Sequence, residues 1–305
     1  MSLATPVAYI AYNRPSHAAR TFRLVAQAKP ETLFIILDGP KEHVPGDAEK
    51  CAAVRNLLSQ IDWKCTVRLN VSADNIGSRK RVQSGLDWVF RHVDRAIVVE
   101  DDCLLDPSFF QFADELLAYY ENDSRVGIIC AQGDELPSNG ASYHASRYPV
   151  LWGWATWRRT WQLYEPDIES WPSTRTSDLL MNALKNPLAA AYWRGQLDRT
   201  YAGLDAWDYQ VNYCCWRHDL LCIHPAVNML SNIGFDAEAT NTVHRRTPFG
   251  EATSRMDFPI RHPATLAVSQ VREARLLDLH YGISSEEALK RVRTRVAIER
   301  AGDAG

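Results

Sequence analysis

The 305-residue chain lacks several features that would place it in a broad class at once. No run approaches the roughly 18 apolar residues of a membrane-spanning helix. The N-terminal stretch MSLATPVAYIAY has no basic region of the kind that opens a signal peptide. We therefore expect a cytoplasmic protein. The 34 Lys and Arg and the 37 Asp and Glu leave a net charge of −3, which excludes an overall basic field for nucleic acid.

Cysteine metal motifs and glycine-rich nucleotide loops are also absent. The seven cysteines include no C-x-x-C pair, so we expect reduced thiols, mostly in the core. No G-x-G-x-x-G opens a helix, which excludes a Rossmann dehydrogenase. The first turn, YNRPSHAAR, has no glycine, which argues against a nucleotidyltransferase that cradles a triphosphate.

The first half instead alternates between apolar runs and helical patterns. We expect strands within residues 6–15, 32–40, 65–72, 95–103 and 126–133, and helices at 16–28, 47–61, 78–93 and 107–123. This alternation predicts an α/β fold, a mostly parallel sheet with helices on both faces. Ligands of such sheets bind beyond the carboxyl ends of the strands.

Polar residues follow four of these runs: Asn13 and Arg14, Asp38 and Gly39, Asn75 to Gly77, and Glu100 to Asp102. Because the carboxyl ends of parallel strands share one edge, we expect a single site there. Three adjacent carboxylates repel one another unless a cation relieves them. Mg²⁺ or Mn²⁺ with a diphosphate would do so, although strand ends also carry ordinary exposed acids.

Aromatic residues cluster in the second half, which has longer loops and a helical pattern at 176–201. Trp152, Trp154 and Trp157 offer planar faces on which the sugar rings of an acceptor could stack. Tryptophan is more often a core residue, so we expect at least one of the three to be buried.

Four motifs, VVEDD, WGWATWRRTW, AWDYQ and HPAVNMLSNIGF, occur in the order found in GT-A glycosyltransferases. Residues 6–244 resemble the group around the Golgi N-acetylglucosaminyltransferase that starts complex N-glycans, with its bacterial family 2-like relatives. The resemblance implies a GT-A catalytic domain over 1–246, with a nucleotide-binding half (1–135) and an acceptor-binding half (136–246). A helical extension (247–305) would follow.

The resemblance also implies an activity. The chain would be a metal-dependent, inverting hexosyltransferase that uses a nucleotide-sugar, a UDP-sugar by preference, on a glycan or lipid-linked acceptor. Arg14, Asp38, Arg81 and Asp101 would bind the nucleotide. The implied ligands of Mn²⁺ or Mg²⁺ are Asp102 and Glu100, with His244 of NTVH as a further candidate, although a lone histidine is more often structural.

The catalytic base stays open between two acids. Asp208 falls at the family's base motif, which carries two adjacent acids, but the second position here is Tyr209. Asp205 is therefore the other candidate. The two acids would share a face if the segment is helical, because they are three residues apart.

The last pattern, residues 284–302, predicts a basic helix with Ser284 and Glu287 spaced as a capping box. It could rest on an anionic membrane surface, but an ordinary solvated face or a dimer contact is the simpler interpretation. A non-catalytic scaffold that binds carbohydrate or a partner is the alternative for the whole chain.

Overall fold

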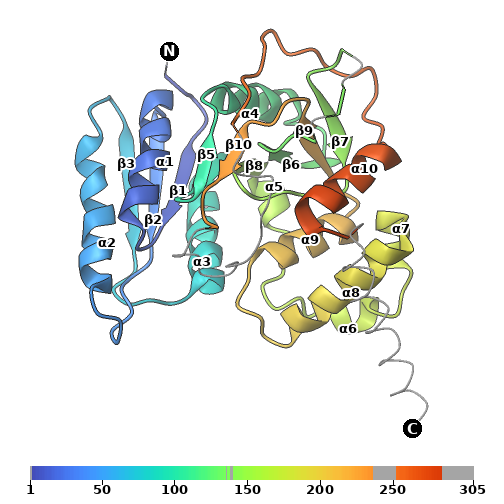
Figure 1. The fold of residues 1–305 in the computed structure, drawn as a ribbon, viewed down its shortest axis with the longest axis horizontal. Helices are drawn as coiled ribbons and strands as arrows, with labels where there is room; N and C mark the ends of the chain where they lie inside the picture. Colours follow the sequence, from blue (N-terminus) through green and yellow to red (C-terminus); the bar gives the residue numbers. More distant parts are fainter. Residues whose placement is uncertain (1, 135, 138–139, 236–251, 284–305) are drawn as a thin grey trace.

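The computed structural model describes residues 2–134, 136–137, 140–235 and 252–283. An eight-stranded sheet forms its centre, in the order β3-β2-β1-β4-β8-β6-β9-β7 (Figure 1). The first four strands run parallel: β1 (Val7–Ala11), β2 (Thr32–Leu37), β3 (Thr66–Val71) and β4 (Arg95–Glu100). The predicted α/β fold class, with a mostly parallel sheet, is confirmed.

The other half of the sheet mixes strand directions. Its strands are β6 (Val126–Cys130), β7 (Tyr143–Ser146), β8 (Trp154–Trp157) and β9 (Leu221–Pro225). β8 runs antiparallel between β4 and β6, and β7 runs antiparallel to β9. The sequence did not predict β8, because four residues flanked by loops carry too short a pattern to show a period.

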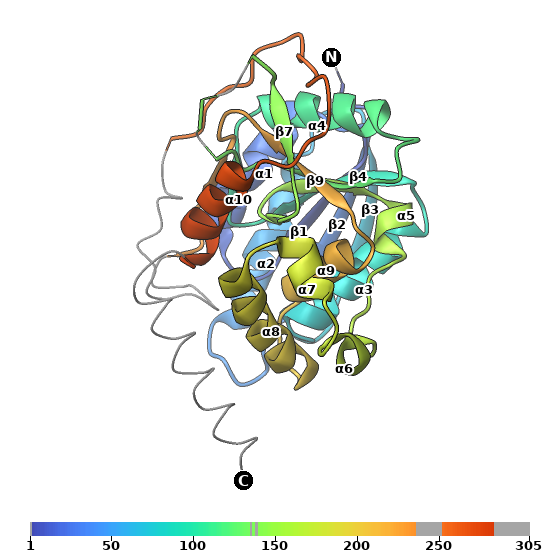
Figure 2. The ribbon, with the colours of Figure 1, turned by 90° about the vertical axis from the view of Figure 1, so that its right-hand side faces the viewer.

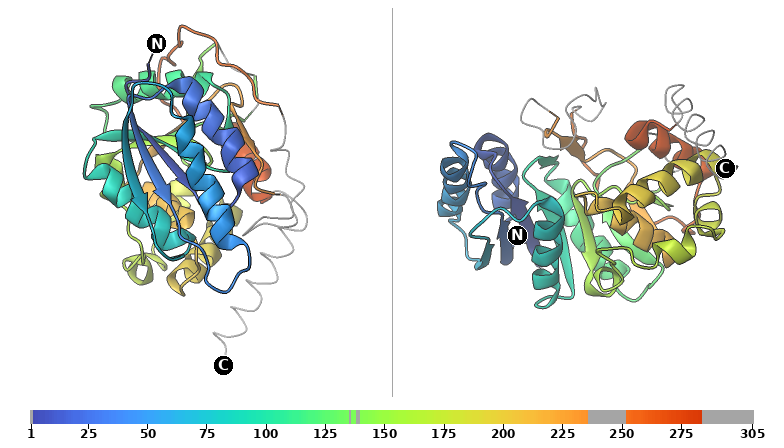
Figure 3. Two further views of the ribbon diagram at one scale, coloured as in Figure 1. Left: turned by 90° about the vertical axis from the view of Figure 1, so that its left-hand side faces the viewer. Right: turned by 90° about the horizontal axis from the view of Figure 1, so that it is seen from below.

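Helices cover both faces of the sheet. Successive side chains of β1 point to opposite faces and all are buried, so both faces must be covered. Val7 and Tyr9 pack into one core and Ala8 and Ile10 into the other. The first face carries α1 (Pro15–Ala28), α2 (Asp47–Asn56) with the short η1 (Leu57–Gln60), and α4 (Ser108–Tyr119), and Figure 3 shows α1 and α2 side by side. The second face carries α3 (Ser78–Phe90), α5 (Arg158–Trp161) and α9 (Asp208–Arg217).

A helical layer builds a third core against α9 (Figure 2). It consists of α6 (Trp171–Thr174), α7 (Leu179–Leu184) and α8 (Pro187–Tyr201). The helical stretch expected at 176–201 is therefore present, but as two helices, α7 and α8. Lys185 takes a left-handed φ of 51° and ends α7, and Pro187 then starts α8, where its missing N–H costs nothing.

Segments far apart in the sequence complete the body. A small antiparallel sheet joins β5 (Cys103–Leu105) to β10 (Leu230–Asn232). Residues 252–283 also pack on the body, since Met256 and Ile260 lie in the first core. They end in α10 (Gln270–Leu276) and the π-helical turn η3 (Leu277–Tyr281). Within the described ranges, no helix has the length and apolar character needed to cross a bilayer.

The helix predicted at 284–302 lies outside the described residues, so nothing tests its capping box or its basic face. The boundary expected at residue 246 falls in the undescribed range 236–251 and stays a prediction.

Candidate functional site

The three acids of VVEDD lie where β4 ends. Glu100 is its last residue, and Asp101 and Asp102 form the turn into β5. The neighbouring strand β1 brings its own turn to the same place, because the backbone N–H of Tyr12 donates to Asp101 Oδ2 at 3.1 Å. Arg14 Nη1 lies 3.4 Å from Asp102 Oδ2. The predicted meeting of the first turn with the acids is therefore observed.

Among the described residues, burial and mutual repulsion of these carboxylates outweigh the positive charge near them. Burial, followed by the charges of Asp102 and Asp101, raises the pKa of Glu100 well above its ordinary value. Burial and Asp102 also raise the pKa of Asp101, to about 7. The Arg14 guanidinium lowers the pKa of both, but not enough to offset the other causes. The cluster would thus gain from additional positive charge.

Asp208 joins this cluster from the second half of the chain. It is the first residue of α9, and its charge is among those that raise the pKa of Glu100. Burial raises the pKa of Asp208 itself, and the N–H groups of Asp208 and Tyr209 lower it. A fourth carboxylate, held at a helix N-terminus, therefore lies near the acids of β4.

Asp205 has a different environment. It is exposed and lies outside α9, so the helical segment that a shared face with Asp208 would require is not present. One of its carboxylate oxygens accepts from the backbone N–H of Arg79 at 3.1 Å, which satisfies a donor in the first turn of α3. This contact gives Asp205 a structural role whether or not it also takes part in chemistry.

Asp38 directly follows β2 and Arg81 lies in the first turn of α3, but both are buried and already bonded. Asp38 accepts from the N–H groups of Gly39 (3.0 Å) and Ile76 (3.1 Å). Arg81 donates to the carbonyl oxygen (2.6 Å) and side-chain oxygen (2.8 Å) of Asn70. Its Nε has no partner among the described residues. These bonds order the loop before α3, and nucleotide binding by the pair stays a prediction.

Two of the three tryptophans expected to bind an acceptor are core residues. Trp154 and Trp157 are 1% and 3% exposed, because β8 lies inside the sheet and its faces are covered. Their predicted stacking on a sugar is wrong, and the expectation of at least one buried tryptophan is confirmed. Trp152, in the loop before β8, is partly exposed.

Little in the sequence indicates the role of Asp47, which organises the turn after β1. The Tyr12 hydroxyl and the Asn13 amide both donate to it, and so does the Lys41 N–H at 2.7 Å. Burial and the Asp47 carboxylate raise the pKa of Tyr12. The polar turn NRP was visible in the sequence, but its partner is 34 residues away along the chain.

The loop after β10 also covers the acids. Ile233 donates its N–H to the Asp102 carbonyl at 2.9 Å, and its own carbonyl lies 3.0 Å from His17 Nε2. A Cβ at Gly234 would lie 2.4 Å from Asp102 Oδ2, so a glycine is needed for this close approach. The motif SNIGF was the signal for this contact.

The described side chains do not by themselves form a complete metal site. Within the described ranges, no group of three or more His, Cys, Asp or Glu side chains is arranged to hold a metal ion. His244, the third predicted ligand, lies outside these ranges. Asp102 has the accessibility that a ligand needs, with a side chain 25% exposed.

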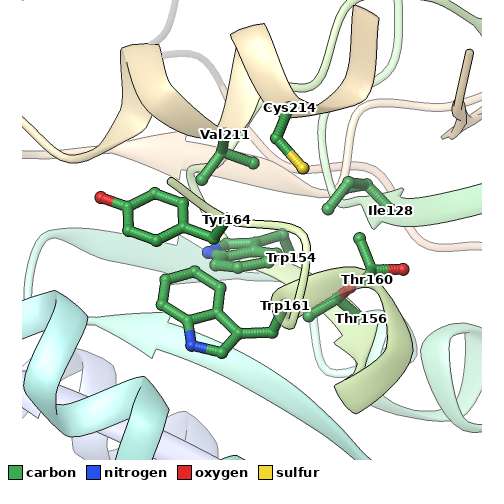
Figure 4. Close-up of a pocket in the computed structure, with 8 residues that line it drawn as sticks. All are labelled: Ile128, Trp154, Thr156, Thr160, Trp161, Tyr164, Val211 and Cys214. Atoms are coloured by element: carbon green, nitrogen blue, oxygen red, sulfur yellow. The ribbon is translucent and has the colours of Figure 1, made fainter. Parts of the chain in front are cut away.

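A small cavity lies between α9 and the sheet, and none of the acids lines it (Figure 4). Its lining residues are Ile128, Trp154, Thr156, Thr160, Trp161, Tyr164, Val211 and Cys214. None of them is charged, so the cavity is a packing feature of the second face rather than a reactive site.

No protein-family model matches the chain, and no curated protein matches it either. Among solved structures, it is similar to the mannosyltransferase PcManGT from Pyrobaculum calidifontis in complex with GDP-Man and Mn²⁺ (TM-score 0.40, 12% identity, 72% of this chain and 70% of that chain). It is also similar to mouse xyloside xylosyltransferase 1 (0.33, 13%, 71% and 84%) and to a UDP-glucose pyrophosphorylase complexed with UDP-glucose (0.32, 9%, 52% and 78%). Likenesses this distant do not assign an activity to the chain.

Proposed function

We propose that this protein is a metal-dependent glycosyltransferase. It would move a sugar, with inversion, from a nucleotide-diphosphate donor, a UDP-sugar by preference, to a hydroxyl group of a glycan or lipid-linked acceptor. One observation carries the proposal. Carboxylates from both halves of the chain, Glu100, Asp101 and Asp102 on one side and Asp208 on the other, gather at the carboxyl end of β4.

The donor side of the proposal rests on charge. Mg²⁺ and Mn²⁺ take hard oxygen ligands, and at nucleotides they use one or two carboxylates plus phosphate oxygens. Asp102, with Glu100 or Asp101, fits this donor set, because the cluster has more negative charge than Arg14 offsets. When bound, the metal would neutralise the leaving diphosphate. Arg14, Asp38 and Arg81 would hold the nucleotide.

The acceptor side rests on Asp208. An inverting transfer needs a carboxylate that takes the proton from the attacking hydroxyl. Burial raises the pKa of Asp208, which makes the carboxylate a stronger base. The opposing effect of the N–H groups at the start of α9 helps it to stay ionised. Asp205 is the weaker candidate, since it is exposed and bonded to α3.

Release of nucleoside diphosphate tests the activity. The protein would be incubated with Mn²⁺, separate UDP-, GDP- and CDP-sugars and a mixture of saccharide acceptors. We expect nucleoside diphosphate to be released from the sugars of one nucleotide class. This release should depend on the acceptor, and EDTA should abolish it. Release of inorganic diphosphate from a nucleoside triphosphate and a sugar phosphate would instead support a nucleotidyltransferase.

A further inference from the structure

We propose that Trp152, Phe235 and His280 form a wall against which a pyranose ring of the acceptor packs. The inference rests on the proposed glycosyl transfer and adds the acceptor's chemical class. Phe235 ends the motif HPAVNMLSNIGF, and His280 lies outside all four quoted motifs; neither was among the residues expected to bind the acceptor. We call these three residues the aromatic wall.

The Trp152 ring contacts both of the other rings, although the three residues lie far apart in the sequence. The ring centroids of Trp152 and His280 are 4.3 Å apart, at an interplanar angle of 56°. Those of Trp152 and Phe235 are 5.4 Å apart, with the rings edge to face at 71°. All three residues are partly exposed, unlike Trp154 and Trp157. The aromatic wall therefore still presents surface to solvent.

Two of its members are next in sequence to glycines that pack closely against the turn of the acids and against β5. Phe235 follows Gly234, whose Cα packs against the Asp102 carboxylate. Gly153, next to Trp152, has φ +67° and lies so close to Leu105 of β5 that a Cβ would be 2.4 Å from Leu105 Cδ2. Both contacts fix the wall beside the turn that carries the acids.

The third member is next in sequence to a residue that bonds to α9, the helix of the proposed base. His280 precedes Tyr281, whose hydroxyl donates to the Asn212 side-chain oxygen at 3.4 Å. The Asn212 amide in turn donates to the Asp208 carbonyl at 3.0 Å. The aromatic wall thus adjoins both the segment that holds Asp102 and the helix that starts with Asp208. An acceptor on it would be next to both ends of the reaction.

The chemistry of the wall favours a sugar ring. Pyranose rings present C–H faces that pack on aromatic rings, while their hydroxyls stay free for hydrogen bonds. The segment that supplies His280 is firmly anchored for this purpose. Arg272 donates to the buried Asp134 at 2.6 and 2.8 Å, and Glu273 accepts from Ser146 and from the Arg147 N–H at 2.6 and 2.9 Å.

The test separates the acceptor from the donor. Calorimetry with UDP, GDP and CDP in the presence of Mn²⁺ first identifies the nucleotide. Transfer from the matching nucleotide-sugars to a panel of para-nitrophenyl pyranosides is then followed by mass spectrometry. The variants are Trp152→Ala, Phe235→Ala, His280→Ala and His280→Phe. Tyr119→Ala is the matched control, because Tyr119 is 58% exposed and also stacks on a histidine, His262.

We expect each alanine variant of the wall to raise the KM for the pyranoside about tenfold, a loss of ~1.4 kcal/mol. Nucleotide affinity should be unchanged, and His280→Phe should restore most of the acceptor affinity. Weaker nucleotide binding by these variants, or an unchanged KM for the pyranoside, would contradict the proposed role of the aromatic wall. So would nucleotide binding by wild type without use of any pyranoside. If no nucleotide binds at all, the proposed function itself fails.

Discussion

At the scale of single residues, the chain concentrates negative charge where it places little positive charge. Glu100, Asp101 and Asp102 share a strand end, and Asp208 adds a fourth carboxylate. Arg14 forms the ion pair with Asp102. Burying carboxylates without partners is costly, so such a cluster persists in proteins when its function requires the charge. A bound cation and diphosphate would supply that reason.

The choice between the two candidate bases can be tested at this scale. Asp208→Asn should reduce transfer about 10²- to 10⁴-fold, the usual contribution of a general base, with little change in nucleotide affinity. Asp205→Ala should lower the free energy of unfolding by about 1 kcal/mol, because it removes the acceptor for the Arg79 N–H. Initial rates and urea unfolding of both variants would show it. A large rate loss confined to Asp205→Ala would reverse the assignment.

The environment of His224 leads us to expect that the free energy of unfolding depends on pH. His224 is buried, and its Nδ1 and Nε2 lie 2.9 and 2.8 Å from the carbonyls of Gln132 and Tyr148, so both nitrogens donate only in the imidazolium form. Burial lowers its pKa, but Cys130 and these carbonyls outweigh burial and raise the pKa to about 9. An unfolded histidine titrates near ~6.5.

The stabilisation from His224 should therefore be fully present below about pH 6.5 and lost as the pH rises through about 9. The free energy of unfolding in urea, measured from neutral pH upward, would reveal this fall. His224→Gln is the control. It should be less stable than wild type at neutral pH and should lack the decrease in unfolding free energy that comes from His224. Parallel profiles for the two proteins would contradict the imidazolium assignment.

At the scale of elements, the loop after β10 positions Asp102. Gly234→Ala should weaken metal-dependent nucleotide binding about tenfold, since its Cβ would meet Asp102 Oδ2 at 2.4 Å and displace the carboxylate. Calorimetry of wild type and variant would measure the change. Unaltered affinity would mean that the Asp102 oxygen in this contact is not a ligand.

Helix α10 is the element that ties residues 252–283 to the sheet. Arg272→Met should destabilise the fold by about 3–5 kcal/mol, because Asp134 is fully buried and would lose its charged partner. The double variant Asp134→Asn, Arg272→Met should recover part of the loss. Urea unfolding of the three proteins tests the pair, and a single variant as stable as wild type would refute the anchor.

Elements with long patterns could be predicted from the sequence, and short ones could not. β2 and β4 were visible because both of their faces are buried, which makes them apolar runs. The turns after β1, β2 and β4 were also visible as polar interruptions. β8 was missed because it has only four residues, and the burial of Trp154 follows from its neighbours β4 and β6. Tertiary position, rather than local pattern, decides that burial.

At the scale of the whole molecule, the candidate site belongs to neither half alone. β4 supplies three acids, α9 supplies Asp208, and the loop after β10 lies over Asp102. Contacts of this kind join residues more than 100 positions apart, so the sequence predicted the participants but not the contacts. The role of Asp47, and the contacts of Trp152 with Phe235 and His280, were missed for the same reason. The sequence did predict that the acids and the turn after β1 meet at one edge of the sheet, as they do in the structure.

Calorimetric titration of UDP, GDP and CDP, with and without Mn²⁺, tests the central claim most directly. It would be run on wild type and on Asp102→Ala. We predict that one nucleotide binds only with the metal and that the variant loses this binding. If a nucleotide bound equally well without metal, or to Asp102→Ala, the carboxylates at the end of β4 would not face a metal-bound diphosphate. Binding of none of the three would contradict the transferase proposal as a whole.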